Sequence, residues 1–172
     1  MKLVDPEFIE SLRGRTSLSQ INGILEQLID YVANYYDDAA YCALKGSCRY
    51  RARTTSCMVG YFITEDMYKT SMEGNVSYSE LHVTDGTLEV DKALEIIGFT
   101  HFARLFLTSC QRIHDKIIDT IVARDSICTN PEEDDYDPLV PLTQEDREEL
   151  IQAFEKIRDD FEKVYFHYAG DI

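Results

Sequence analysis

The sequence predicts a mostly helical α+β fold, with a small antiparallel β-hairpin or three-stranded sheet among the helices. Two observations support this prediction. Apolar residues recur at helical spacing in three long stretches, which cover residues 17–38, 100–124 and 143–172. The stretch between residues 47 and 64 alternates polar and apolar residues and ends in a short apolar run, a pattern typical of a hairpin.

The chain is long enough to form one core, because it has 172 residues of which 44% are hydrophobic. We expect a single α+β core domain over residues 1–128. An acidic segment bounded by prolines over residues 129–142 is typical of a linker. A C-terminal amphipathic helix over residues 143–172 should then pack on the core or in a homodimer.

The first long helix is expected over Ser17–Asp38. Ser17 lies three residues before Gln20, which is a capping-box pattern at a helix start. The apolar face of this helix is formed by Leu18, Ile21, Leu25, Leu28, Val32 and Tyr35. By this spacing Tyr35 belongs to the core, whereas Tyr36 and Tyr41 are expected at the core boundary or exposed.

The hairpin is expected between Ser47 and Thr64, with strands over Arg49–Arg53 and Cys57–Ile63. Thr64 is followed by two acidic residues, which predicts a cap for a short helix over Glu65–Lys69.

Two helices should follow and meet at a tight corner. Thr87 is expected to cap the first, over Leu88–Ile97, and Gly98 to end it. Thr100 should open the second, which reaches about Arg124.

The last helix is expected to start at Thr143, with Asp146 at the capping-box position. Its apolar residues form a narrow stripe: Leu150, Phe154, Ile157, Phe161, Val164 and Tyr168. The stripe covers fewer than three heptads, which favours packing on the domain or in a dimer over a long coiled coil.

The charge of the chain is strongly acidic, with 32 acidic and 17 basic residues and a formal charge of −15. This argues against direct binding to nucleic acid or to an anionic membrane surface, which requires a basic face. No apolar run approaches the roughly 20 residues of a membrane span, and the N-terminus has no secretory signal pattern. We therefore expect a cytoplasmic protein.

Two-thirds of the negative charge lies between residues 131 and 172, where the net charge is −10. An acidic amphipathic helix predicts a non-enzymatic protein that binds and inhibits a basic partner protein by charge mimicry. The expected partner-binding residues are Asp134, Asp135, Asp137, Glu148 and Asp159.

The segment from residue 39 to residue 64 has the opposite character, because it contains no acid. Arg49, Arg51 and Arg53 alternate along the expected strand and would share one face. Three readings stay open: acids of the C-terminal segment pair with this face, an anionic ligand or nucleotide binds it, or it is solvated. With a ligand on this face, the protein would be a small-ligand-binding or nucleotide-binding protein or an enzyme, with a site formed by Arg49, Arg51, Arg53, Cys57, Tyr68 and His114.

Catalytic and metal-binding patterns are weak. Cys57, His114 and Asp115 could form a nucleophile, a base and an orienting group, but adjacent helix residues point about 100° apart, so Asp115 should not orient His114. Cys42, Cys48 and Cys57 lack paired spacing and a fourth ligand for zinc. We expect no catalytic residue, no metal and no cofactor.

Several short motifs resemble a family of small uncharacterised phage and bacterial proteins. They are Cys48-x-Tyr50-Arg51, Cys57-Met58-Val59-Gly60, Met72-Glu73-Gly74-Asn75 and Gln111-x-x-His114-Asp115, together with Ile63, Asp66 and Tyr68. The similarity covers roughly residues 48–115. It implies a phage or bacterial cytoplasmic setting and assigns no role to any residue.

Overall fold

The computed structural model describes residues 1–42, 47–52, 54–73, 85–127 and 139–169. It confirms a mostly helical α+β fold with a small antiparallel sheet. The elements are α1 (Pro6–Ser11), α2 (Ser17–Tyr35), β1 (Asp38–Cys42), β2 (Ser47–Cys48), α3 (Met58–Phe62), the 3₁₀ turn η1 (Thr70–Met72), α4 (Asp85–Ile97), α5 (His101–Arg124), β3 (Leu139–Pro141) and α6 (Gln144–Ala169).

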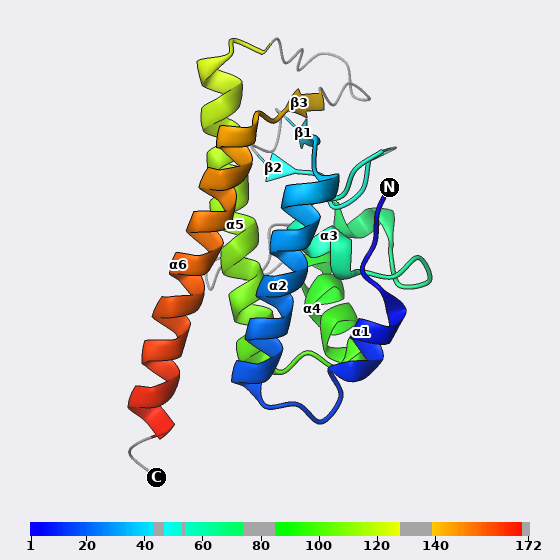
Figure 1. Ribbon diagram of the computed structural model, residues 1–172. Helices are drawn as coiled ribbons and strands as arrows, with labels where there is room; N and C mark the ends of the chain where they lie inside the picture. Colours follow the sequence, from blue (N-terminus) through cyan, green and yellow to red (C-terminus); the bar gives the residue numbers. More distant parts are fainter. Residues whose placement is uncertain (43–46, 53, 74–84, 128–138, 170–172) are drawn as a thin grey trace.

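Three long helices form the main layer of the molecule. Helices α2, α5 and α6 pack against one another, and α1, α3 and α4 lie on the other side of α2 from α6 (Figure 1). The fully buried side chains of these helices include Ile21 and Leu28 of α2, Phe106 of α5 and Leu150 and Phe154 of α6. None of the described helices is both long and apolar enough to cross a membrane.

The burial of apolar residues decreases along α6 from its N-terminal to its C-terminal half. Leu150 and Phe154 are fully buried, and the ring of Phe161 packs edge-on against Phe106 with centroids 5.7 Å apart. Val164 and Phe166 are 44% and 57% exposed, at the end of α6 that extends past α2 and α5 in Figure 1. The first half of the stripe is therefore held inside this chain.

The sheet lies at one end of the helical layer and has the order β2-β1-β3, with both pairs antiparallel. Tyr41 is opposite Cys48 in the first pair, and Ala39 is opposite Val140 in the second. A hairpin therefore exists, but its strands lie before the position expected from the sequence. Of the expected strand over residues 49–53, the described part contains one isolated bridge, between Arg51 and Ser56, and residue 53 lies outside the described residues.

The expected strand over Cys57–Ile63 is wrong, because these residues form α3. Cys57 caps this helix, and its Sγ accepts a hydrogen bond from the Gly60 N–H at 3.4 Å. All five helical residues are buried, so the run needs no polar face and looks like a strand in sequence. The expected helix after Thr64 is also wrong: the N–H groups of Met67 and Tyr68 close a turn on the Thr64 carbonyl.

The end of α4 and the start of α5 agree with the sequence. Gly98 has a φ of +115°, a conformation that favours glycine, and follows the last residue of α4. Thr100 caps α5 by accepting a hydrogen bond from the Ala103 N–H. Helix α4 starts at Asp85, three residues before the expected Leu88.

The start of α2 differs from the sequence prediction, and this difference affects the corner between α4 and α5. Thr16, and not Ser17, caps α2 by accepting from the Ser19 N–H. The Gln20 amide is then available to donate to the carbonyls of Leu12 and Gly98, both at 2.9 Å. Its oxygen accepts from the Thr100 N–H at 2.8 Å. One buried side chain thus joins the turns before α2 and before α5.

The capping box of α6 is confirmed. Asp146 N–H donates to Thr143 Oγ1 at 3.1 Å, and Thr143 N–H donates to the Asp146 carboxylate at 2.9 Å. Arg124, at the end of α5, donates to the same carboxylate at 2.7 Å. The start of α6 is therefore tied to the end of α5.

We expect Asp146→Asn to remove part of the acid dependence of stability. The Arg124 guanidinium, together with hydrogen bonds from Thr143, lowers the pKa of Asp146 from 3.8 to about 2. A carboxylate with a lowered folded-state pKa stabilises the fold above its unfolded pKa, and this stabilisation is lost as pH falls towards the folded pKa. The difference in free energy of unfolding between wild type and variant should therefore shrink from about pH 4 to about pH 2.

Urea unfolding at a series of pH values measures this difference. Glu145→Gln, an exposed change in the same turn, is the control. A difference between wild type and Asp146→Asn that stays constant down to pH 2 would contradict the role of the Arg124–Asp146 pair.

Candidate functional site

A buried cluster of polar side chains lies where the sheet, the C-terminal end of α2 and the middle of α5 meet. We call Tyr36, Cys48, Gln111, His114 and Asp115 the buried polar cluster. Each of these residues is less than 10% exposed, and Tyr36 and His114 are fully buried. Such groups are costly to bury unless they are paired, so their partners decide what the cluster can do.

One oxygen of Asp115 organises the cluster. Asp115 Oδ1 accepts hydrogen bonds from Gln111 Nε2 at 2.7 Å and from the Cys48 N–H at 3.2 Å, and lies 3.0 Å from His114 Nδ1. Gln111 Oε1 accepts from the Val59 N–H at 3.0 Å. These contacts connect α5 to β2 and to α3.

The ring of His114 has a defined tautomer. Its Nε2 lies 2.7 Å from the hydroxyl of Tyr36, whose pKa burial raises well above the ordinary range, so that hydroxyl stays protonated. Because a carboxylate oxygen can only accept, Nδ1 carries the proton that is donated to Asp115, and Nε2 accepts a hydrogen bond from the Tyr36 hydroxyl.

This arrangement corrects two expectations from the sequence. Asp115 does orient the ring of His114, because Nδ1 is the ring nitrogen nearer the backbone and lies beside the neighbouring carboxylate. Tyr36 is fully buried, and Tyr35, expected in the core, is 50% exposed.

The second oxygen of Asp115 differs from the first. Asp115 Oδ2 is buried and has no hydrogen-bond partner among the described residues. Cys48 Sγ, a ring nitrogen of His114 and an oxygen of Asp115 all lie within 4.8 Å of one another. The cluster thus brings together three kinds of atom that bind metal ions.

Arg51 is placed differently from the exposed strand face expected from the sequence. Its guanidinium is buried, pairs with Glu65 at 2.6 Å and donates to the Ile63 carbonyl. It also lies over the ring of Tyr68, 4.8 Å from the centroid. The acid that pairs with Arg51 therefore comes from the turn after α3.

Glu73 stabilises the same region through its carboxylate. It accepts hydrogen bonds from the N–H groups of Tyr50 and Arg51, both at 2.9 Å, and from the Tyr68 hydroxyl at 2.7 Å. Arg51 and Tyr68 are thus engaged within the chain, and this occupancy does not favour an anionic ligand at Arg51.

The other residues of the expected ligand site have different surroundings. Arg49 is half-buried, and Arg53 lies outside the described residues. Cys57 is fully buried, and burial raises the pKa of its thiol well above the ordinary range, which disfavours the nucleophilic thiolate. His114 belongs to the buried polar cluster and not to the surroundings of Arg51.

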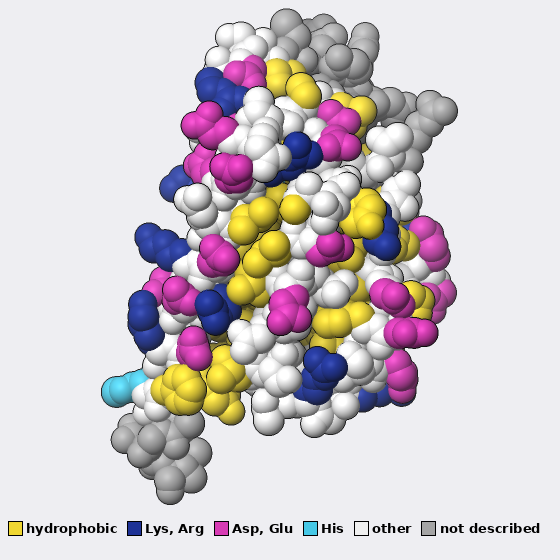
Figure 2. Space-filling view, viewed as in Figure 1, with side chains coloured by type: hydrophobic (Ala, Val, Ile, Leu, Met, Phe, Trp, Pro, Cys, Tyr) yellow, Lys and Arg dark blue, Asp and Glu magenta, His cyan; other side chains and the backbone are white. Residues whose placement is uncertain are grey.

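The outward face of α6 is strongly acidic. At 100° per residue, five acids lie opposite the buried Leu150 and Phe154, and all five are exposed. We call them the acidic stripe: Glu145, Glu148, Glu149, Glu155 and Asp159. Figure 2 shows acidic side chains along α6 and across α2 with basic ones between them, and hydrophobic side chains at the lower end of α6.

The expected partner-binding residues divide into two groups. Glu148 and Asp159 are exposed on the acidic stripe. Asp134, Asp135 and Asp137 lie outside the described residues.

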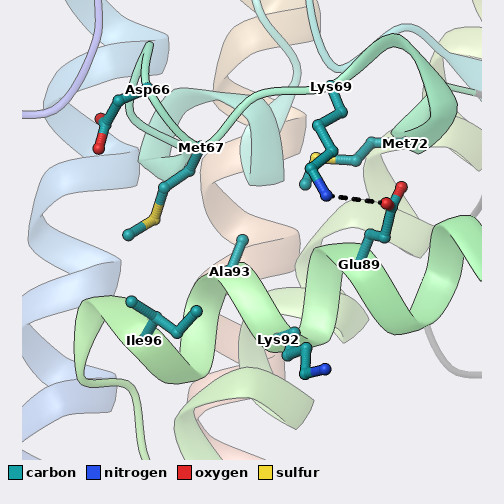
Figure 3. A pocket seen from close by; sticks show the side chains of 8 residues that line it. All are labelled: Asp66, Met67, Lys69, Met72, Glu89, Lys92, Ala93 and Ile96. Carbon is teal, nitrogen blue, oxygen red and sulfur yellow. Dashed lines mark hydrogen bonds and ion pairs between the residues drawn. The ribbon is translucent and has the colours of Figure 1, made fainter.

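A shallow pocket lies between α4 and the segment that contains η1 (Figure 3). Its volume is about 180 Å³, and the Lys69–Glu89 ion pair of 3.0 Å lies at its edge. Binding sites for small molecules usually enclose about 300–1,000 Å³. The pocket is therefore too small to support a ligand-binding function.

No family model, curated protein or solved structure matches this chain. The resemblance to phage and bacterial proteins thus stays an expectation, and the function has to be inferred from the geometry.

Sequence reasoning considered His114 and Asp115 only as part of a catalytic group with Cys57, which it rejected. The structure brings Cys48, Tyr36 and Gln111 to them instead. Two motifs quoted for the resemblance, Cys48-x-Tyr50-Arg51 and Gln111-x-x-His114-Asp115, contain four of the five cluster residues. They were the signal in the sequence that could have indicated the cluster.

Proposed function

We propose that this protein is a non-enzymatic interaction protein that binds a basic segment of another protein through the acidic stripe of α6. The observation that supports the proposal is the exposure of four acids of the stripe and their lack of ion pairs. Glu145, Glu148, Glu149 and Glu155 are exposed and form no ion pair with any described residue. Their charge is therefore available to a partner.

The basic residues of α6 do not cancel this charge. Arg147 pairs with Asp37 at 2.7 Å, and Lys163 pairs with Asp160 at 3.1 Å. Arg158 pairs with Asp159 at 3.0 Å, at one end of the stripe. Between Glu145 and Asp159, helical spacing places only one base, Lys156, on the outward face.

The inner face of α6 holds the stripe in place. Because Leu150 and Phe154 are fully buried, the first half of the helix is fixed to the core before any partner binds. A partner then avoids much of the entropy cost of ordering this helix. Carboxylates that follow one face of a rigid helix resemble a nucleic-acid backbone, so the natural partner would be a nucleic-acid-binding surface of a host or phage protein in a bacterial cytoplasm.

We expect the variant E145Q/E148Q/E149Q/E155Q to bind a fluorescent arginine-rich peptide at least about tenfold more weakly than wild type. The control variant E7Q/E10Q/D66N/E95Q neutralises four exposed acids on α1, α4 and the turn after α3. Both variants have a formal charge of −11 instead of −15, so they differ only in where the charge is removed. Fluorescence anisotropy at about 0.05 M and about 0.3 M salt measures the dissociation constants.

The control variant should bind the peptide within about threefold of wild type, and high salt should weaken all binding. Equal losses in the two variants would mean that binding follows net charge and not the stripe. Such a result, or binding by wild type that does not respond to salt, would contradict the proposal.

A further inference from the structure

We propose that Cys48, His114 and Asp115 form a binding site for one zinc ion, which joins β2 to α5. This inference is independent of the acidic stripe. The three residues supply a sulfur, a nitrogen and an oxygen ligand, the donor types that zinc takes from proteins, and the second carboxylate oxygen of Asp115 or a water molecule would take the fourth position of a tetrahedral ion. Cys48 is not part of a disulfide, and the thiolate form of a cysteine is the form that binds zinc.

The distances suit a single ion. Ligands about 2.0–2.3 Å from a tetrahedral zinc ion lie roughly 3.3–3.7 Å from one another. The three ligand atoms are all within 4.8 Å of one another, and His114 Nδ1 lies 3.0 Å from Asp115 Oδ1. A pair of ligand atoms at the 4.8 Å limit would have to approach by about 1 Å to surround an ion, a movement that side-chain rotation can supply.

The Asp115 carboxylate provides a second, independent observation. Its Oδ2 atom is buried and has no hydrogen-bond partner among the described residues, whereas Oδ1 has three neighbouring donors. A buried carboxylate oxygen without a partner is costly, and a cation beside it would remove that cost. The charges also balance, because a thiolate and a carboxylate together carry the charge of one divalent cation with opposite sign.

The surrounding residues suit the ligand roles. When the ion binds Nδ1, the ring proton moves to Nε2, and the Tyr36 hydroxyl 2.7 Å away rotates its own proton aside and accepts the hydrogen bond from Nε2. Gln111 Nε2 holds the Asp115 carboxylate in place. Metal-binding histidines usually donate their second N–H to such a partner, and the partner fixes the orientation of the ring.

Burial of the three ligands determines the kind of site. A substrate would not reach an ion enclosed by β2 and α5, so the ion would stabilise the fold. Metal that binds only the folded chain shifts the folding equilibrium. Free zinc at a hundred times its dissociation constant would raise the folding equilibrium constant about 100-fold.

The test is to unfold the full chain and refold it with cobalt(II), zinc(II) or EDTA. Cobalt replaces zinc in such sites, and a bound thiolate gives a charge-transfer absorption in the near ultraviolet. We expect one cobalt per chain with this absorption, and a higher melting temperature in zinc than in EDTA. Cys48→Ser should abolish the absorption, and Tyr36→Phe should weaken binding about 10–100-fold.

Cys110→Ala is the matched control, because it removes another buried thiol from the same region of the core and should keep the absorption. If Cys48→Ser fails to refold, Asp115→Asn replaces it, and at least tenfold weaker cobalt binding is expected. A wild-type chain with no charge-transfer absorption and no change in melting temperature would overturn the proposal. Absorption that persists in a folded Cys48→Ser variant, or unchanged affinity in Asp115→Asn, would also overturn it.

Discussion

Replacing Gly60 with alanine is expected to lower the free energy of unfolding by at least about 3 kcal/mol. A Cβ atom on Gly60 would lie 1.8 Å from the carbonyl oxygen of Tyr50 and 2.6 Å from its carbonyl carbon. Both neighbours are backbone atoms, so no side-chain rotation can relieve the clash. Helix α3 would have to move away from the segment after β2, and all five residues of α3 are buried.

Gly23→Ala is the matched control for this prediction. A Cβ on Gly23 would meet the ring of Phe8 at 3.1 Å, and a side-chain ring can shift by the small amount needed. Alanine also favours the helical conformation by up to about 1 kcal/mol, so the net change should stay within about 1 kcal/mol. Urea unfolding followed by circular dichroism measures both variants, and a Gly60→Ala protein as stable as Gly23→Ala would show that α3 does not lie against Tyr50.

The second large effect is expected for Asp115→Ala. Removal of the carboxylate leaves the Cys48 N–H, Gln111 Nε2 and His114 Nδ1 without their common acceptor. A buried donor left without a partner costs about 1–3 kcal/mol, and three of them in one place should cost at least about 3 kcal/mol in total. We expect this loss in EDTA, where no metal contributes to stability.

Asp115→Asn keeps the volume of the side chain and an acceptor oxygen, so it distinguishes the loss of hydrogen bonds from the loss of the carboxylate charge. Its amide oxygen can still accept at the position of Oδ1, so this variant should lose clearly less stability than Asp115→Ala. Chemical denaturation of both variants gives the comparison. Equal free energies of unfolding for the two would contradict the view that Oδ1 organises the buried polar cluster.

The helix boundaries were largely predictable because they depend on local chemistry. Gly98 ends α4 and Thr100 caps α5 through contacts within a few residues of each. Thr143 and Asp146 form the capping box of α6 in the same way. Rules based on sequence spacing apply well where the partner of a group lies three or four positions away.

Features that depend on distant segments were not predictable. The apolar run Cys57–Ile63 could be a strand or a helix by composition, and packing on all sides makes it α3. Gln20 looked like part of a capping box, yet its partners are Leu12, Gly98 and Thr100. In each case the deciding contact comes from another part of the chain.

The buried polar cluster was even less predictable, because its residues are farther apart in the sequence. Tyr36 and His114 are 78 positions apart, and Cys48 and Asp115 are 67 apart. No periodicity links such pairs, so the sequence could mark His114 and Asp115 without showing which cysteine joins them. Arg51 pairs with Glu65, which lies in a turn where the sequence predicted a helix.

The strand order β2-β1-β3 has a consequence for how the protein is made. β1 is the central strand, and its pairing of Asp38 with Pro141 closes a loop of about 100 residues. During synthesis, one edge of β1 is without its partner until β3 has left the ribosome, and an open edge can pair with other chains. The domain therefore completes its fold only after nearly the whole described chain has been translated, and a nascent chain stalled before Leu139 would expose that edge.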